Sequence, residues 1–337
     1  MSDNNHTLDV LSIGDVVTDA FIKLLDDRAY TFENEHGKFL AMPYGLKVPF
    51  DHAEVIEAVG NASNAAVSFA KLGLHSGLVS NVGGDSHGRD IIQALHDKKV
   101  DSRFVIINPN KLSNYHYVLW YKDERTILIK HEEYDYHWPR FRSIDIPKWA
   151  YFSSISKNAL DSYHDLVADW LAENKDVKFA FQPGTFQLEA GVERLKRLYE
   201  RCEVLILNRE EAVQVTKGNY DDLHSLLDTL HGYGPSIVCI TDGPAGAYAS
   251  DGTQRLKMPP YPDPAPPFER TGAGDAFAST FVAALIHGNN IEGALQWAPI
   301  NSMNVVQHTG AQAGLLTEQE IGDYLKKAPD WYKAEPF

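Results

Sequence analysis

Short runs rich in β-branched and aromatic residues alternate with longer helical patterns along most of this 337-residue chain. The strands that this pattern predicts are residues 10–14, 77–82, 149–153, 177–181, 204–207 and 237–241. The predicted helices are residues 64–72, 90–98, 161–173, 189–200, 209–216 and 221–231. Repeated strand-then-helix order predicts an α/β fold with a mainly parallel sheet that helices cover on both faces.

The carboxyl ends of these strands are the expected place for a binding site. Ligands bind beyond that edge of an open α/β sheet. Gly14 and Asp15, Asn208, and Asp242 with Gly243 all follow directly on predicted strands. We therefore expect these distant positions to meet at one edge.

Charge and cysteine content narrow the class of partner. The chain carries 31 Lys and Arg against 46 Asp and Glu, so its formal charge of −15 disfavours nucleic acid and anionic lipid. A small molecule is the expected partner. Cys202 and Cys239 lie in apolar strand-like runs and are expected to be buried, unpaired thiols. The polar residues 1–9 contain no apolar signal segment and no apolar run reaches the roughly 18 residues of a membrane span, so we expect a cytoplasmic protein.

Two segments break the alternation. Residues 21–50 show no helical period, and residues 113–136 resemble a β-hairpin in which Tyr115, Tyr117, Leu119 and Tyr121 alternate before the polar turn 122–124. We expect one domain over residues 1–337, with a small sheet over the site formed by about 16–58 and 113–137. An extra hairpin at the edge of the main sheet is the alternative.

The run Thr271-Gly272-Ala273-Gly274-Asp275 precedes an apolar helical pattern. At a helix N-terminus, unpaired N–H groups and the positive end of the helix dipole favour an anion such as phosphate. Asp275 begins this helix and is placed to accept a proton from an attacking hydroxyl. The pattern indicates a phosphoryl-transfer site, although a glycine turn with an acidic first-turn residue would look the same.

A second group of residues is suited to binding a polyol. Asp19 follows the first strand, and Gly60, Asn61 and Asn64 begin the next helix. One carboxylate and two amides beside a glycine can each bond a hydroxyl group. Taken singly, Asn64 is equally typical of a helix cap and Asp19 of a solvated turn.

Two further motifs lie at predicted strand ends. Asn208 and Glu211 fit a phosphate contact and a water-mediated Mg²⁺ ligand, and they equally fit a helix-capping pair. The glycine-rich run from Thr241 through Gly243 to Gly246 suits a loop against a nucleotide or an ordinary turn.

Histidines and acids alternate along one short segment. His131, Glu133, Asp135 and His137 would share one face of a strand. A solvated edge is the more common role for such a row, so we assign no metal to it.

In chain order, these motifs together with residues 81–88 and Gly310-Ala311-Gln312 resemble the ribokinase-like (PfkB) carbohydrate kinase family across nearly the whole chain. The resemblance implies a Rossmann-like central sheet with a β-sheet lid, ATP and Mg²⁺, and phosphorylation of a primary hydroxyl of a sugar or nucleoside. It also implies a homodimer through the lid. Glu269-Arg270 stand where the family often has Asp-Thr, which leaves dependence on a monovalent cation open.

The resemblance also implies a role for each matching position. Asp275 is the expected base, and the amides of Gly272, Ala273 and Gly274 are the expected anion hole. The expected substrate ligands are Asp19, Gly60, Asn61 and Asn64, and Glu211 is the expected Mg²⁺ ligand. The expected nucleotide contacts are Asn208, Thr241, Gly243, Gly246 and Gly310.

Other functions stay open at this stage. A sugar kinase is the leading hypothesis, with a nucleoside kinase as its alternative. A catalytically silent sugar or nucleotide sensor would use the same pocket. A dinucleotide-dependent oxidoreductase ranks last, because no Gly-x-Gly-x-x-Gly run follows the first strand.

Overall fold

The computed structural model describes residues 7–122 and 124–337, so the expectations for residues 1–6 and for Asp123 lie outside it. In the described part, the main sheet has the strand order β16-β15-β14-β13-β12-β11-β10-β1-β6-β7. The strands from β13 to β7 in this order are parallel, and β14, β15 and β16 continue the sheet antiparallel. Their bounds are β1 Val10–Ile13, β6 Ser76–Gly83, β7 Val105–Asn108, β10 Trp149–Phe152, β11 Lys178–Phe181, β12 Val204–Asn208, β13 Ile237–Thr241, β14 Ala247–Ser250, β15 Arg255–Met258 and β16 Glu335–Pro336.

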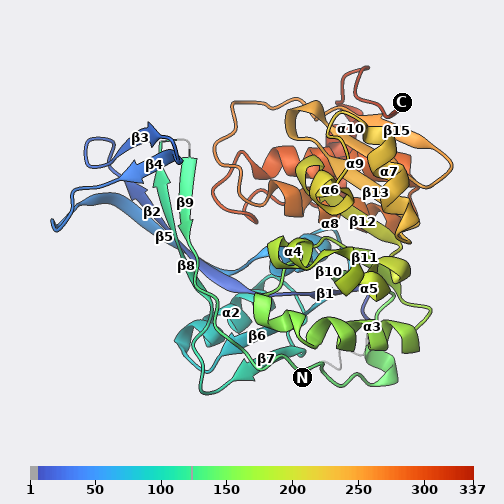
Figure 1. The fold of residues 1–337 in the computed structure, drawn as a ribbon, viewed down its shortest axis with the longest axis horizontal. Coiled ribbons are helices and arrows are strands. Elements are labelled where there is room, and N and C mark those ends of the chain that lie inside the picture. Colours follow the sequence, from blue (N-terminus) through green and yellow to red (C-terminus); the bar gives the residue numbers. More distant parts are fainter. Residues whose placement is uncertain (1–6, 123) are drawn as a thin grey trace.

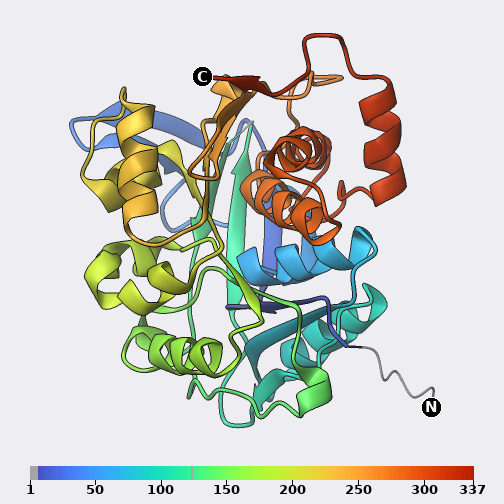
Figure 2. The same ribbon diagram turned by 90° about the vertical axis from the view of Figure 1, so that its right-hand side faces the viewer.

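Helices cover both faces of this sheet (Figure 2). One face carries α1 (Asn61–Lys71), α2 (Ser86–Asp97), α8 (Ala273–Ile286), α9 (Ile291–Val305) and α10 (Glu318–Lys326). The other carries α3 (Tyr163–Glu173), α4 (Thr185–Arg194), α5 (Lys196–Arg201), α6 (Arg209–Thr216) and α7 (Leu223–Gly232). Short 3₁₀ turns occupy Ser143–Asp145, Lys157–Leu160 and Gly243–Ala245. The predicted α/β fold is confirmed, and each predicted strand is present.

One helix prediction was wrong. The expected single helix 189–200 is two helices, because Gly191 leaves the helical region with φ 78° and α5 begins only at Lys196. Helix α9 continues through a proline, Pro299. Pro299 and its neighbours Ala298 and Ile300 are buried, so core packing offsets the one backbone hydrogen bond that a proline cannot donate.

A second sheet stands apart from the main one and projects from the body (Figure 1). Its order is β5 (Phe50–Val59), β2 (Val17–Leu24), β8 (Tyr115–Tyr121) and β9 (Glu124–Leu128), with the hairpin of β3 (Tyr30–Asn34) and β4 (Gly37–Ala41) beside it. Strands β2 and β8 pair parallel and the other pairs are antiparallel. The hairpin of β8 and β9 is therefore part of a separate sheet and does not extend the edge of the main one.

Strand β1 lies at the position where the order of the main sheet changes direction. The chain passes from β1 to β6 on one side, and β10 pairs with the other side of β1. Such switch points leave a crevice beyond the carboxyl ends of the strands. Gly14 and Asp15 leave β1 at this point, and the second sheet begins immediately after them at Val17.

No helix in the described part of the chain is long and apolar enough to span a bilayer.

Candidate active site

Asp275 lies in the first turn of α8, where two asparagines from the first turn of α1 hold its carboxylate. Asn61 Nδ2 donates to Asp275 Oδ1 at 2.7 Å, and Asn64 Nδ2 donates to Oδ2 at 2.8 Å. The residue is only 7% exposed. Burial raises the pKa of the Asp275 carboxyl, whereas hydrogen bonds from Asn64, Asn61 and Gln182 act to lower it. Each carboxylate oxygen retains a lone pair for a third donor, such as a substrate hydroxyl.

A chain of hydrogen bonds extends from Asn64 away from the carboxylate. Gln312 Nε2 donates to Asn64 Oδ1 at 2.8 Å, and Lys98 Nζ donates to Gln312 Oε1 at 2.6 Å. Accepting from Gln312 fixes the Asn64 amide with its N–H₂ group toward Asp275. Gln312 and Lys98 therefore help to position the Asp275 carboxylate indirectly.

The two glycines before Asp275 have different surroundings. A Cβ on Gly272, whose φ is 78°, would lie 2.2 Å from the Cβ of Ala311, so this glycine permits packing against residue 311. Gly274 faces open space, with no atom within 4 Å of an added Cβ. Its backbone N–H side is thus the part of the helix N-terminus that an anion can approach.

A cavity of about 560 Å³ opens beside Gly274. Its wall includes the predicted residues Thr241, Gly243 and Gly246. Apolar and aromatic side chains complete the wall and are suited to a flat heterocycle. The larger of these apolar and aromatic side chains are Tyr261, Phe277, Met303, Val306 and Trp331.

Asn208 and Glu211 form the capping pair that was one of two interpretations. Asn208 Oδ1 accepts from the Glu211 N–H at 2.8 Å, and Glu211 Oε2 accepts from the Asn208 N–H at 2.9 Å. Burial raises the pKa of Glu211, and the negative charges of Glu210 and Asp275 raise it further. The two residues share the electrostatic field of Asp275 but are not among the described residues that line the 560 Å³ cavity.

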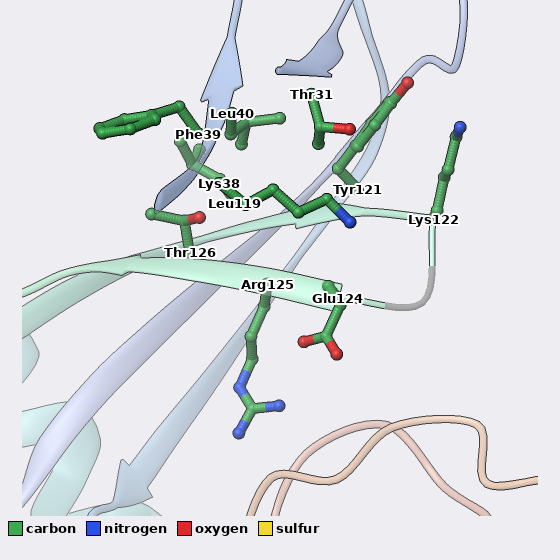
Figure 3. A pocket seen from close by; sticks show the side chains of 10 residues that line it. All are labelled: Thr31, Lys38, Phe39, Leu40, Leu119, Tyr121, Lys122, Glu124, Arg125 and Thr126. Atoms are coloured by element: carbon green, nitrogen blue, oxygen red, sulfur yellow. The ribbon is translucent and has the colours of Figure 1, made fainter. Parts of the chain in front are cut away.

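Glu269 ties three segments together beside the glycine run. Its Oε2 accepts from the Gly310 N–H at 3.1 Å, and its Oε1 accepts from the N–H and the hydroxyl of Thr271. Arg125 of β9 reaches the same carboxylate, with Nη1 3.1 Å from Oε1. Figure 3 shows the Arg125 side chain leaving β9 on the side away from the β3–β4 hairpin. Gly310, a predicted nucleotide contact, is thus placed next to the helix N-terminus and outside the cavity wall.

Asp19 belongs to a cluster at the base of the second sheet. His116 of β8 is its neighbour in register, with Nδ1 3.4 Å from Asp19 Oδ1. Asp15 lies close by, where its carboxylate accepts from the Tyr136 hydroxyl and the Ser156 N–H, each at 2.7 Å. His131 Nδ1 is 4.0 Å from Asp15 Oδ2.

Gly60 connects this cluster to Asp275. A Cβ on Gly60, whose φ is 103°, would lie 3.0 Å from the Asp15 carbonyl oxygen, and the next residue, Asn61, bonds the Asp275 carboxylate. The structure thus brings Asp15, Asp19, Gly60, Asn61 and Asn64 to the region of Asp275.

Sequence reasoning gave no role to several residues of this region. For Asp15 the sequence did contain a signal, because the residue follows Gly14 at the end of a predicted strand. His131 had been placed only in a row of alternating acids and histidines, and the segment after β9 is irregular instead of a strand. Lys98, His116 and Arg125 meet the site only through tertiary folding, which no local pattern encodes. The described residues contain no group of three or more His, Cys, Asp or Glu that could hold a metal ion.

The model of the pfkB family carbohydrate kinases matches residues 52–318 of this chain. Among curated relatives, an ATP-dependent 6-phosphofructokinase of Thermoanaerobacterium thermosaccharolyticum is 24% identical over 267 residues, which cover 75% of this chain and 80% of the relative. A nucleoside kinase of Methanothermobacter thermautotrophicus is 24% identical over 284 residues, covering 82% and 86%.

Solved structures show the same fold. Arabidopsis thaliana ribokinase complexed with ribose and ATP superposes with a TM-score of 0.74 at 18% identity, covering 95% of this chain and 99% of that one. A putative ribokinase II from E. coli, in complex with ATP and Mg²⁺, gives 0.72 at 16% identity, covering 95% and 99%.

Proposed function

The chain belongs to the pfkB family of carbohydrate kinases, and we propose that it transfers the γ-phosphoryl group of ATP to a primary hydroxyl of a sugar or related polyol. Because the chain belongs to this family, it is a phosphotransferase of the sugar and nucleoside kinase type. The relatives include a phosphofructokinase and a nucleoside kinase, so membership alone leaves the acceptor open. A nucleoside acceptor is the alternative within the same chemistry.

The observation that carries the proposal is the position of Asp275. Two asparagine amides hold its carboxylate at the start of α8, beside the open backbone of Gly274. In the proposed step, Asp275 accepts the hydroxyl proton while the substrate oxygen bonds to the γ-phosphorus. The bond from this phosphorus to the β,γ-bridging oxygen breaks, and ADP leaves.

The N-terminus of α8 supports the transferring group. The N–H groups of Gly272 and Gly274 lie at the start of the helix, where N–H groups have no intrahelical acceptor, and the Ala273 N–H makes only a 3.5 Å bond to the Arg270 carbonyl. In this proposal all three face developing negative charge. The adjoining 560 Å³ cavity, with Thr241, Gly243 and Gly246 in its wall, accommodates the nucleotide. Asn208 and Gly310 complete the phosphate side in this proposal.

The donor set fits a magnesium ion held mainly by substrate oxygens and water. Mg²⁺ commonly binds through one or two carboxylates plus phosphates, and Glu211 supplies a carboxylate whose negative neighbours would be offset by a cation. When bound, Mg²⁺ would neutralise charge on the phosphates during transfer. We assign no monovalent cation, because the Arg125 guanidinium already neutralises Glu269.

The second sheet is the proposed lid over the acceptor. It joins the body at Asp15 to Val17 and touches the catalytic loop through Arg125 and Glu269, so its movement would open or cover the site. Large apolar side chains are exposed on it, which suits pairing with a second copy through the lid. These are Tyr30, Tyr44, Leu46, Phe50 and Leu128. Residence in the cytoplasm completes the proposal, in keeping with the two free cysteines.

An ATP-consumption assay with pooled sugars and pooled nucleosides tests this function. We expect acceptor-dependent release of ADP from at least one pool. Binding of ATP and of an acceptor with no turnover would instead indicate a silent sensor and would contradict the proposal.

A further inference from the structure

The cluster near Asp19 contains polar atoms that the protein itself leaves without partners. Asp19 Oδ1, His116 Nε2 and His131 Nδ1 are each buried and accept or donate no hydrogen bond among the described residues. Buried polar atoms are costly when they stay unpaired, so such atoms in a native fold take a partner from water, an ion or a ligand. Three of them within one small region indicate a place for several ligand hydroxyls.

The four side chains of this cluster come from separate segments that meet at the base of the lid. Asp15 follows β1, Asp19 lies on β2, His116 lies on β8 and His131 follows β9. The His116 and His131 rings stand edge to face with centroids 5.4 Å apart. Adjacent hydroxyl groups of one ligand could supply the missing partners, because a hydroxyl can both donate to a carboxylate and accept from an imidazole N–H.

The charge of the cluster is negative. Its two carboxylates face two imidazoles, and among the described residues no lysine or arginine is seen to pair with Asp15 or Asp19. Two basic groups close to the site are already engaged, Arg125 with Glu269 and Lys98 with Gln312. Arg270 lines the 560 Å³ cavity, whose described wall includes none of the four cluster residues. A carboxylate or phosphate of the acceptor at this cluster would therefore meet like charge, with no lysine or arginine paired to the cluster to offset it.

We propose that the acceptor of this kinase is an uncharged polyol with neighbouring hydroxyl groups, held by Asp15, Asp19, His116 and His131, and that sugar acids and sugar phosphates are rejected. This inference rests on the proposed function, since it specifies the acceptor of the same site. A free sugar and the ribose of a nucleoside share this chemistry.

Calorimetric binding to the Asp275→Asn variant, saturated with a non-hydrolysable ATP analogue, separates acceptor choice from turnover. The probes are ribose, fructose and adenosine against fructose 6-phosphate and 2-keto-3-deoxygluconate. We expect at least one neutral probe to bind 100-fold or more tightly than either anion. Ribose or fructose binding would identify a sugar site, and adenosine binding a nucleoside site.

Tighter binding of an anionic probe, or binding of none of the five, would overturn this inference. Neither result would by itself refute phosphoryl transfer, which is tested by the release of ADP in the pooled assay with the wild-type protein. The two proposals can therefore fail separately.

Substitutions in the cluster provide a second test. His131→Gln and Asp15→Asn should each weaken binding of the preferred neutral probe at least 10-fold and leave binding of the ATP analogue within twofold. His137→Gln, at an exposed histidine of the same segment, is the matched control and should change neither. His131 is partly exposed, so its variant tests the cluster without changing the buried Asp15 carboxylate. Unchanged acceptor binding in both folded variants would contradict the assignment.

Discussion

Asp15 is a carboxylate that the fold keeps almost out of contact with water, at 6% exposure. Burial raises its pKa to about 6, against the lowering effects of the Tyr136 hydroxyl, the Ser156 N–H and nearby His116. His131 also faces it. Burial raises the pKa values of Tyr134 and Tyr163, and the charge of Asp15 raises them further. Burying this carboxylate lowers the stability of the folded protein. Such a loss of stability is expected at a binding site, where stability is traded for function.

The pH dependence of unfolding follows from this shift. Because the folded pKa lies above the ordinary 3.8, the contribution of Asp15 to stability is present below about pH 4 and is lost as pH rises through about 6. Asp15→Asn should remove this loss and stabilise the protein by up to about 3 kcal/mol at pH 8. Chemical denaturation of the wild-type protein and of Asp15→Asn at pH 5 and pH 8 measures this gain in stability. An equal difference between the two proteins at both pH values would contradict the assignment.

Strand β9 contacts the loop around Glu269 and Thr271 through one side chain. Arg125 is 28% exposed and its partner Glu269 is 6% exposed, so removal of the guanidinium leaves a buried carboxylate without its counter-ion. Breaking a fully buried pair costs about 3–5 kcal/mol, and the partial exposure of Arg125 reduces this. The ion pair therefore couples the lid to the loop of Thr271 and Gly310.

Arg125→Ala should lower the free energy of unfolding by about 2 kcal/mol and raise the KM for the acceptor more than that for ATP. The physical reason is that the lid loses its link to Glu269 while the nucleotide cavity keeps its wall. Lys130→Ala, which removes the ion pair between an exposed lysine and Glu132, is the matched control. Equal loss of stability in the two variants would show that the Arg125 contact has no special role.

At the scale of the whole molecule, local patterns were sufficient for the main sheet and insufficient for the site. Buried strands such as β12 and β13 are continuous apolar runs, so their positions are readable from sequence. The sequence predicted that Gly272 belongs to an anion site at a helix N-terminus. It did not predict the close packing of Gly272 against Ala311, because residue 311 is distant in the chain. The pairing of Arg125 with Glu269 likewise depends on tertiary folding.

The exposed apolar side chains of the second sheet lead to a prediction about assembly. If two lids pair in solution, Leu46→Glu with Phe50→Glu should convert a dimer to a monomer, because both side chains are more than half exposed. Sedimentation velocity measures this, with Ile144→Glu, an exposed apolar position on the body, as control. A monomeric wild-type protein would rule out pairing through the lid.

The most direct test of the account is the turnover of Asp275→Asn with the acceptor that the wild-type protein uses. The substitution preserves the size of the side chain but removes the proton acceptor, so kcat should fall about 10²- to 10⁴-fold. Calorimetric affinity for the ATP analogue should stay within twofold of wild type, since the nucleotide cavity is untouched. A kcat within threefold of wild type would show that Asp275 is not the base.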